Sequence, residues 1–243
     1  MKRKVFNIRT RYDRVSTEKR ILSTCVRLFL EQGFSNTPPK QIFSEADVSA
    51  GTFYHLYRSK SDVLTELTKF MFSNQFSIAG KIAGEGASPV LLYAVETSIQ
   101  LTLAELNEKL REIYVEVYTQ PDLLNLVHQK TAPELKKIFA AYLPEASDSD
   151  FYEIEIGTAG IMRAYMARPC DVYFTLERKL GRFLQMELRV LNVPEEEIQQ
   201  VLSAIRALDI RAIAENVMQQ LFQALEMQYE FSLSSRSAFQ TEE

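Results

Sequence analysis

Apolar residues recur every three or four positions along almost the whole chain, and this spacing limits the fold more than any other feature. The pattern is clear in Ile21, Cys25, Leu28 and Phe29, and it returns in later segments such as 198–205. A repeat of this kind places apolar side chains on one face of an α-helix, whereas a strand would alternate at every second residue. Only 8 Gly and 8 Pro occur in 243 residues, so the turns that sheets need are scarce. We therefore predict an all-α fold.

The composition is that of a globular protein. Apolar residues make up 46% of the chain and charged residues 25%, which is enough to bury a core. Cys25 and Cys170 lie far apart and show no metal-ligand spacing, so we expect neither a disulfide nor a metal site. No stretch approaches the roughly 18 uninterrupted apolar residues of a transmembrane helix, and no signal peptide is recognisable. We expect a soluble, cytoplasmic protein.

Charge is distributed unevenly between the two ends of the chain. Residues 1–60 hold twelve Lys and Arg against five Asp and Glu, whereas the whole chain has a net charge of −4. A basic segment attached to an acidic body is typical of a protein whose first part meets a polyanion. A solvated basic tail without a partner is the alternative interpretation.

Hydroxyl residues begin the predicted helices of the basic segment, because their side chains can accept hydrogen bonds from backbone N–H groups of the first turn. Ser16 is predicted to cap a first helix that ends at Gly33, and Thr37 with two following prolines opens a second. A third helix is expected to begin near Ser49, and Ser59 caps a fourth. Two short helices joined by a tight turn and supported by another form a helix-turn-helix, whose second helix enters the DNA major groove.

The expected second helix of this pair carries small and polar residues suited to DNA contact. The small residues 49–52 would let its first turn approach the duplex. Tyr54 and His55 would point outward to bond a phosphate or a base edge, with half-buried packing as the alternative for both. Phe53 and Tyr57 would pack inward. The predicted DNA-contacting residues are Thr37, Lys40, Ser49, Ala50, Gly51, Thr52, Tyr54, His55 and Lys60.

From about residue 17 to residue 70 the chain resembles the TetR/AcrR family of bacterial transcriptional regulators. The segment "ILSTCVRLFLEQGFSNTPPKQIFSEADVSAGTFYHLYRSKSDVL" is similar to that family's helix, Gly-Phe, Thr, short helix and Val-Ser-x-Gly-Thr followed by aromatic residues and Ser-Lys. It departs from the pattern at Thr24-Cys25, Pro38, Phe43 and Asp47. The resemblance implies an N-terminal helix-turn-helix domain followed by a larger helical domain for ligand binding and dimerisation.

We predict two domains and a terminal tail. They are a DNA-binding domain at 1–60 with a basic arm at 1–15, an effector-binding and dimerisation domain at 61–231, and a disordered tail at 232–243. One short recognition helix binds weakly, so we expect a homodimer on a palindromic operator, joined through segments 175–191 and 196–228. The expected partners are double-stranded DNA, a small-molecule effector and a second copy, with no membrane and no cofactor.

Aromatic and methionine side chains of the larger domain mostly build its core, and some are candidates for an effector pocket between helices. Arg163 lies among apolar neighbours, where its charge needs a carboxylate or an acidic ligand as partner. The predicted pocket residues are Tyr93, Tyr114, Tyr118, Phe139, Met162, Arg163 and Tyr165.

Three other features have ordinary structural interpretations. Cys25 is expected in the core rather than as a redox sensor. His128 is a lone histidine, for which a metal or ligand role is the minor alternative. The acids near 148–155, among them Glu153 and Glu155, are expected at the solvated start of a helix.

We therefore expect a sequence-specific DNA-binding transcriptional regulator, a repressor that a small-molecule effector releases. The alternative is a helical protein-binding module that binds no DNA. The chain contains no P-loop, GxSxG, HExxH or Rossmann glycine pattern and only two histidines, so we expect no enzyme activity.

Overall fold

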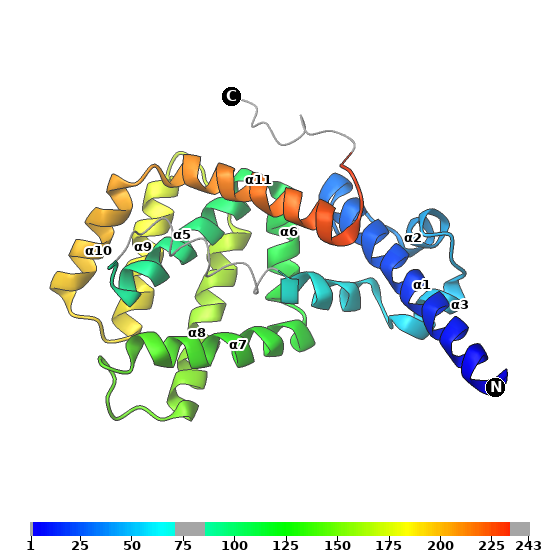
Figure 1. Cartoon of the computed structure of the whole chain (residues 1–243). Coiled ribbons are helices and arrows are strands. Elements are labelled where there is room, and N and C mark those ends of the chain that lie inside the picture. The colour runs from blue at the N-terminus through cyan, green and yellow to red at the C-terminus, as the bar shows by residue number, and fades with distance from the viewer. Residues whose placement is uncertain (1, 71–85, 234–243) are drawn as a thin grey trace. The chain divides into compact units, whose positions relative to one another are not determined.

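A computed structural model of the protein describes residues 2–70 and 86–233, and these contain helices and no strand (Figure 1). The all-α prediction is confirmed. The chain divides into two compact units: unit 1 is Met1–Leu67 with Gln220–Glu243, and unit 2 is Thr68–Gln219. The domain boundary expected at residue 60 stays a prediction, and the tail expected at 232–243 lies almost entirely outside the described residues.

The first helix, α1 (Lys2–Gln32), begins well before the expected cap at Ser16, and the predicted basic arm is its first part. Neither Gly nor Pro occurs before residue 33, so nothing in the sequence stops the helix from extending to its start. The predicted end is confirmed, because Gly33 adopts a left-handed φ of 93° and its N–H donates to Phe29 O at 3.1 Å. The ring of Phe34 then turns back onto Phe29.

Two seven-residue helices follow, α2 (Pro39–Glu45) and α3 (Ala50–Leu56). The N-cap of α2 is Pro38, not Thr37 as expected, because the Thr37 hydroxyl donates to Gly33 O at 2.7 Å instead. Asp47 turns the chain between the helices with a φ of 51°. Ser49 caps α3 as predicted, since its Oγ accepts from Thr52 N at 3.0 Å.

Helical residues 60–70 come next, and Asp62 fixes their start. Its carboxylate accepts from Arg58 N at 2.7 Å and from the Ser59 hydroxyl at 3.1 Å. The predicted pairing of Ser59 with Asp62 is therefore present. The Ser59 hydroxyl is the donor in this pair, and the Asp62 carboxylate also accepts from the backbone N–H of Arg58, just before the helix.

The core of unit 1 joins its helices through fully buried side chains. Ile21, Cys25 and Phe29 from α1 meet Ile42 from α2 and Phe53 from α3, all without exposed area. Cys25 is thus a core residue as expected, and burial raises the pKa of its thiol to about 12. Because a helix turns about 100° per residue, burying Phe53 directs the residues beside it outward.

Unit 2 is built from longer helices that begin with the residues expected for helix starts. Ser88, Asn107, Ser147 and Thr175 each accept a hydrogen bond from the backbone N–H three residues further along, in the first turn of the helix that follows. The helices are α5 (Pro89–Leu106), α6 (Glu108–Val117), α7 (Pro121–Phe139), α8 (Asp148–Ala167), α9 (Leu176–Val190), α10 (Glu195–Ala207) and α11 (Ile210–Tyr229), whose last part belongs to unit 1.

The centre of unit 2 is α5, which packs against α6, α7, α8, α9 and α10. Contact on so many sides buries polar residues of α5 along with the apolar ones, including Glu96 and Thr97. The polar residues of α8 and α9 that face this helix are buried with them. Within the described ranges, no helix has both the length and the apolar character that a membrane crossing requires.

Candidate functional site

The outer face of α3 brings together most of the residues predicted to contact DNA. These exposed residues are Ser49, Ala50, Gly51, Thr52, Tyr54 and His55. The inward packing of Phe53 explains their common direction, because the helix is attached to unit 1 through that ring. The expectation that Phe53 is buried is confirmed, and Tyr57 is half-buried beside it.

The first turn of α3 is both small and rigid. The hydroxyl groups of Ser49 and Thr52 lie 2.8 Å apart, in addition to the capping bond. A Cβ added at Gly51 would lie 3.7 Å from Ser49 Oγ, which is ordinary van der Waals contact. Unit 1 therefore folds without needing a glycine here, and the missing side chain leaves space on the solvent side.

Tyr54 presents its hydroxyl from a ring that neighbours hold in place. The side chain is 51% exposed, while its ring makes edge contacts with Phe43 at 5.6 Å and Phe53 at 5.5 Å. Phe43 is one of the departures from the family pattern, and here it supports the exposed tyrosine. A fixed ring with a free polar end loses little conformational entropy when it binds.

Thr37 and Lys60 differ from the expectation that they face DNA. Thr37 is fully buried, and Lys60 Nζ donates to the carbonyls of Phe34 at 2.6 Å and Thr37 at 3.1 Å. The ammonium also lies 4.3 Å from the centre of the Phe34 ring. Both side chains hold the connection between α1 and α2 in place. A hydroxyl group or a cation in a DNA-binding motif can either contact DNA or hold a turn in place, and the sequence does not distinguish these two roles.

Two cations of the helix-turn-helix remain exposed, one on α2 and one just after α3. Most bases of residues 14–60 have protein partners: Arg14 with Glu18, Lys19 with Glu230, Arg20 with Ala46 O, and Arg27 with Glu31 and Glu45. Lys40 and Arg58 have exposed side chains that form no hydrogen bond or ion pair with the described residues. Lys40 is among the residues predicted to contact DNA, whereas Arg58, which follows the C-cap of α3, is not.

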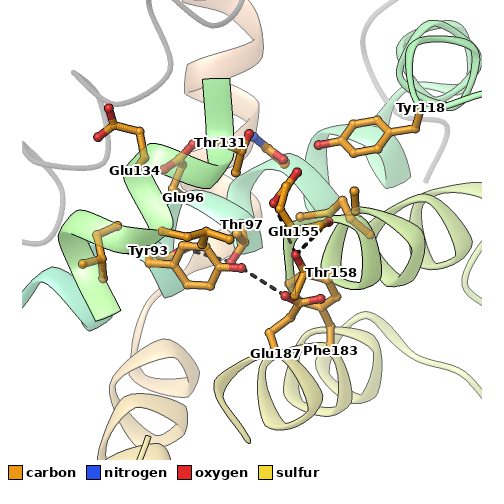
Figure 2. Close-up of a pocket in the computed structure, with 15 residues that line it drawn as sticks. Tyr93, Glu96, Thr97, Tyr118, Thr131, Glu134, Glu155, Thr158, Phe183 and Glu187 are labelled. Atoms are coloured by element: carbon orange, nitrogen blue, oxygen red, sulfur yellow. Dashed lines mark hydrogen bonds between the residues drawn. The ribbon is translucent and has the colours of Figure 1, made fainter. Parts of the chain in front are cut away.

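Unit 2 contains a cavity of about 50 Å³ between α5, α6, α7, α8 and α9. Figure 2 shows the side chains that surround it. Three of the predicted pocket residues line it, namely Tyr93, Tyr118 and Met162. Tyr114 does not line it.

The other three pocket predictions are placed elsewhere. Phe139 is fully buried and supports Tyr93 from behind, with ring centres 5.2 Å apart. Tyr165 packs on the rings of Phe174 and Phe183. Arg163 is exposed and its Nε donates to Thr119 Oγ1 at 2.9 Å, so the expected carboxylate or acidic ligand is not needed.

Three buried glutamates line the cavity, Glu96 from α5 and, more deeply buried, Glu155 and Glu187. Glu155 is 3% exposed and Glu187 is 1% exposed. Tyr93 donates to Glu187 Oε2 at 3.1 Å, and Thr158 Oγ1 lies 3.3 Å from Glu155 Oε2 (Figure 2). Burial disfavours the charged form and raises the pKa of both carboxyls to about 8. The expectation that Glu155 is a solvated helix-start acid is wrong.

The burial of Glu155 and Glu187 is predictable from their positions in the apolar helical repeat. Glu187 follows Leu180, Phe183 and Leu184 at the spacing of one apolar helix face, and Glu155 follows Phe151 in the same way. An acid inside such a stripe is buried whenever the stripe is. Both acids therefore lie on apolar helix faces that the sequence itself predicts.

His128 is buried beside Glu155, but its ring favours the neutral form and so does not offset the negative charge of that carboxylate. Its Nδ1 lies 3.5 Å from Glu155 Oε1, and burial lowers the pKa of the imidazole, which favours the neutral ring. Among the described residues, no group of three or more His, Cys, Asp or Glu is arranged to hold a metal ion.

The geometry defines a class of protein: an all-helical chain with an N-terminal helix-turn-helix and a larger helical unit with a cavity lined by apolar and acidic side chains. Residues 21–67 match the family model described as bacterial regulatory proteins, tetR family. These residues of the chain thus carry a DNA-binding domain of this family. The family consists of transcriptional regulators rather than enzymes, which confirms that expectation.

Three curated relatives are HTH-type transcriptional regulators. The chain is 28% identical over 82 residues to YuxN of Bacillus subtilis, covering 34% of this chain and 28% of YuxN. It is 28% identical over 98 residues to AcrR of Shigella flexneri, covering 37% of this chain and 46% of AcrR. It is 25% identical over 191 residues to YvkB of Bacillus subtilis, covering 75% of this chain and 90% of YvkB. The matches to YuxN and AcrR thus span less than half of each relative.

A solved structure has the same fold. RolR, solved in complex with the ligand resorcinol, superposes with a TM-score of 0.61 over 79% of this chain and 95% of its own. The two sequences are 16% identical, so the likeness concerns the fold alone.

Proposed function

We propose that the protein is a transcriptional repressor that binds a palindromic operator in double-stranded DNA as a cytoplasmic homodimer. A small-molecule effector in the cavity of unit 2 would release it. The observation that carries this proposal is the outer face of α3, where small residues, two ring side chains and nearby unpaired cations are exposed together.

The face has the properties that major-groove recognition requires. The first turn, from Ser49 to Thr52, carries no bulky side chain that would hold the helix away from the base edges. Tyr54 and His55 lie on the next turn, where they can bond bases or phosphates. Lys40 and Arg58 supply the charge that attracts the phosphate backbone.

The weak binding of one short recognition helix is the reason to expect a dimer. Two recognition helices on one palindrome bind far more tightly than one, because the second contact is intramolecular. We assign the dimer contact to segments 175–191 and 196–228, as the sequence predicts.

A ligand that favours one spacing of the two DNA-binding units of the dimer would change operator affinity. A coupling free energy of about 1–3 kcal/mol between the ligand and DNA sites suffices. RolR, with its bound resorcinol, supports a small molecule as the effector.

A selection from fragmented genomic DNA, followed by gel-shift titration of the retained fragment, tests this function. We expect one palindromic fragment to be bound much more tightly than random duplex. The double change of Tyr54→Ala and His55→Ala should weaken operator binding by about tenfold or more. The matched control is Tyr173→Ala, since Tyr173 is 84% exposed in unit 2. Retention of a protein partner without affinity for any duplex would contradict the proposal and favour a protein-binding module.

A further inference from the structure

The cavity of unit 2 contains a buried carboxylate oxygen that no described residue satisfies. Glu187 Oε2 accepts from Tyr93, but Glu187 Oε1 has no hydrogen-bond partner. Glu187 lines the cavity together with Glu155 (Figure 2). A buried polar atom without a partner costs free energy in either protonation state, because a carboxylate needs donors and a carboxyl group needs an acceptor as well. The missing partner is therefore expected from outside the chain.

Among the described residues, no lysine or arginine forms a hydrogen bond or ion pair with Glu155 or Glu187. The residues that line the cavity include four glutamates and neither lysine nor arginine. The nearby titratable groups are Tyr93 and Glu96 from α5, Tyr114 from α6, Tyr118 at its C-cap, and His128 and Glu134 from α7. Of these only His128 could become positive, and its burial favours the neutral ring. The electrostatic field inside the cavity is thus one that attracts positive charge.

Elsewhere in unit 2 a buried charge is paired. Lys179 is 1% exposed, and its Nζ donates to Glu105 Oε2 at 2.7 Å and to Arg168 O at 2.6 Å. This is the usual arrangement for a buried ion. The contrast with Glu155 and Glu187 distinguishes the cavity acids from ordinary structural ones.

We propose that the cavity binds a compact protonated primary amine, whose N–H groups donate to Glu187 Oε1 and to the carboxyl group of Glu155. The rings of Tyr93, Tyr118 and Phe183 line the same space and can face the cation. Leu135, Ile138 and Met162 offer apolar surface to a short carbon chain. The inference rests on the proposed function, because it names the chemical class of the effector.

The volume of the cavity limits the size of the amine, and the two carboxyl groups make its affinity depend on pH. A cavity of about 50 Å³ suits a compact amine. The bound ammonium favours ionised carboxyls, so binding releases a proton at pH values below the pKa of about 8. The affinity for an amine should consequently increase with pH up to that value, whereas the affinity for a neutral molecule of the same shape should not.

Calorimetric titration of the full chain with n-butylamine, in the absence of DNA and at constant ionic strength, tests the inference. The neutral comparison ligands are 1-butanol, which has the same chain length, and resorcinol. We expect n-butylamine to bind about tenfold or more tightly than either, with its affinity rising about tenfold or more from about pH 6.5 to about pH 8.5. No binding of n-butylamine, equal binding of a neutral ligand, or an affinity independent of pH would overturn the inference.

Variants locate the site. Glu187→Gln should weaken n-butylamine binding by about tenfold or more, because the amide carries no charge but can still accept from Tyr93. Glu155→Gln should do the same, and it serves as the test if the first variant does not fold by circular dichroism. Glu153→Gln is the matched control, since Glu153 is exposed on the same helix as Glu155. Wild-type affinity in a folded Glu187→Gln or Glu155→Gln variant would place the amine elsewhere and contradict the proposal.

Gel shifts with the operator separate this inference from the proposed function. Operator binding together with no amine binding would overturn the amine site alone. Amine binding that leaves operator affinity unchanged would contradict effector release, while the amine site would stand.

Discussion

At the scale of single residues, Gly51 separates the needs of DNA recognition from those of folding. The space around it accepts a Cβ within the free protein, with Ser49 Oγ 3.7 Å away. Only a partner that approaches the helix from solvent would meet the added methyl group. A substitution here therefore reports on the approach of DNA rather than on the stability of unit 1.

Gly51→Ala should leave the free energy of unfolding unchanged or raise it by about 1 kcal/mol or less, because alanine favours a helix more than glycine does. The same variant should lose operator affinity by about tenfold or more, because the methyl group occupies space at the base edges. Urea unfolding and gel-shift titration measure the two effects. Full operator affinity in this variant would show that the first turn of α3 does not touch DNA.

Glu187 links the stability of the protein to pH. Its pKa is raised from 4.5 to about 8, so the folded state holds a proton that the unfolded chain releases. The stabilising contribution is complete below about pH 4.5 and is lost as the pH rises to about 8, at about 1.4 kcal/mol per pH unit.

Urea unfolding at several pH values should therefore show a steeper loss of stability between about pH 5 and 8 in the wild type than in Glu187→Gln. Glu153→Gln, the exposed control on α8, should keep the wild-type slope. Equal slopes in all three proteins would mean that Glu187 ionises at its ordinary pKa in the folded state.

The two kinds of site residue differ in how far the sequence could predict them. The outward direction of Tyr54 and His55 follows from local spacing around Phe53, so the sequence alone predicts it. The unpaired oxygen of Glu187 depends on what α5 and α8 place opposite it, and no local pattern contains that information. Arg163 shows the same limit, because its partner Thr119 lies 44 residues away in the sequence.

At the scale of elements, short helices were predictable where a residue with one clear conformational role marks a boundary. Gly33 ends α1 through its left-handed φ, and Ser49 begins α3 through its hydroxyl. The start of α1 was not predictable in this way, because Ser16 and the residues before it tolerate a helix equally well. Thr37 bonded backward to Gly33 O rather than forward to α2, a choice that depends on the fold of the turn.

Ser49→Ala tests the importance of the α3 cap. The change removes the hydrogen bond to Thr52 N and the contact with the Thr52 hydroxyl. The free energy of unfolding should fall by about 1 kcal/mol, and operator affinity should fall with it as the first turn loosens. Ser44→Ala, at an exposed position within α2, is the control and should change neither quantity. Equal stability of the two variants would show that the cap contributes nothing.

At the scale of the whole molecule, operator binding as proposed requires two copies to act together. Sedimentation velocity of the full chain should show a dimer, and a stoichiometric titration should place two chains on one palindromic fragment. Changing Leu180, which is buried in α9, would disturb the core, so the dimer contact is better tested with the exposed Val190→Glu change. A monomer that binds the operator with full affinity would contradict the dimer.

Binding of the operator at increasing salt tests the central claim, that α3 and the cations beside it meet duplex DNA. Lys40 and Arg58 of each protomer would give about four phosphate contacts per dimer, so operator affinity should fall about a hundredfold between about 50 and 200 mM KCl. The double variant Lys40→Gln and Arg58→Gln should bind more weakly and show a much shallower salt dependence. An operator affinity that is independent of salt, or a wild-type slope in the double variant, would contradict the claim.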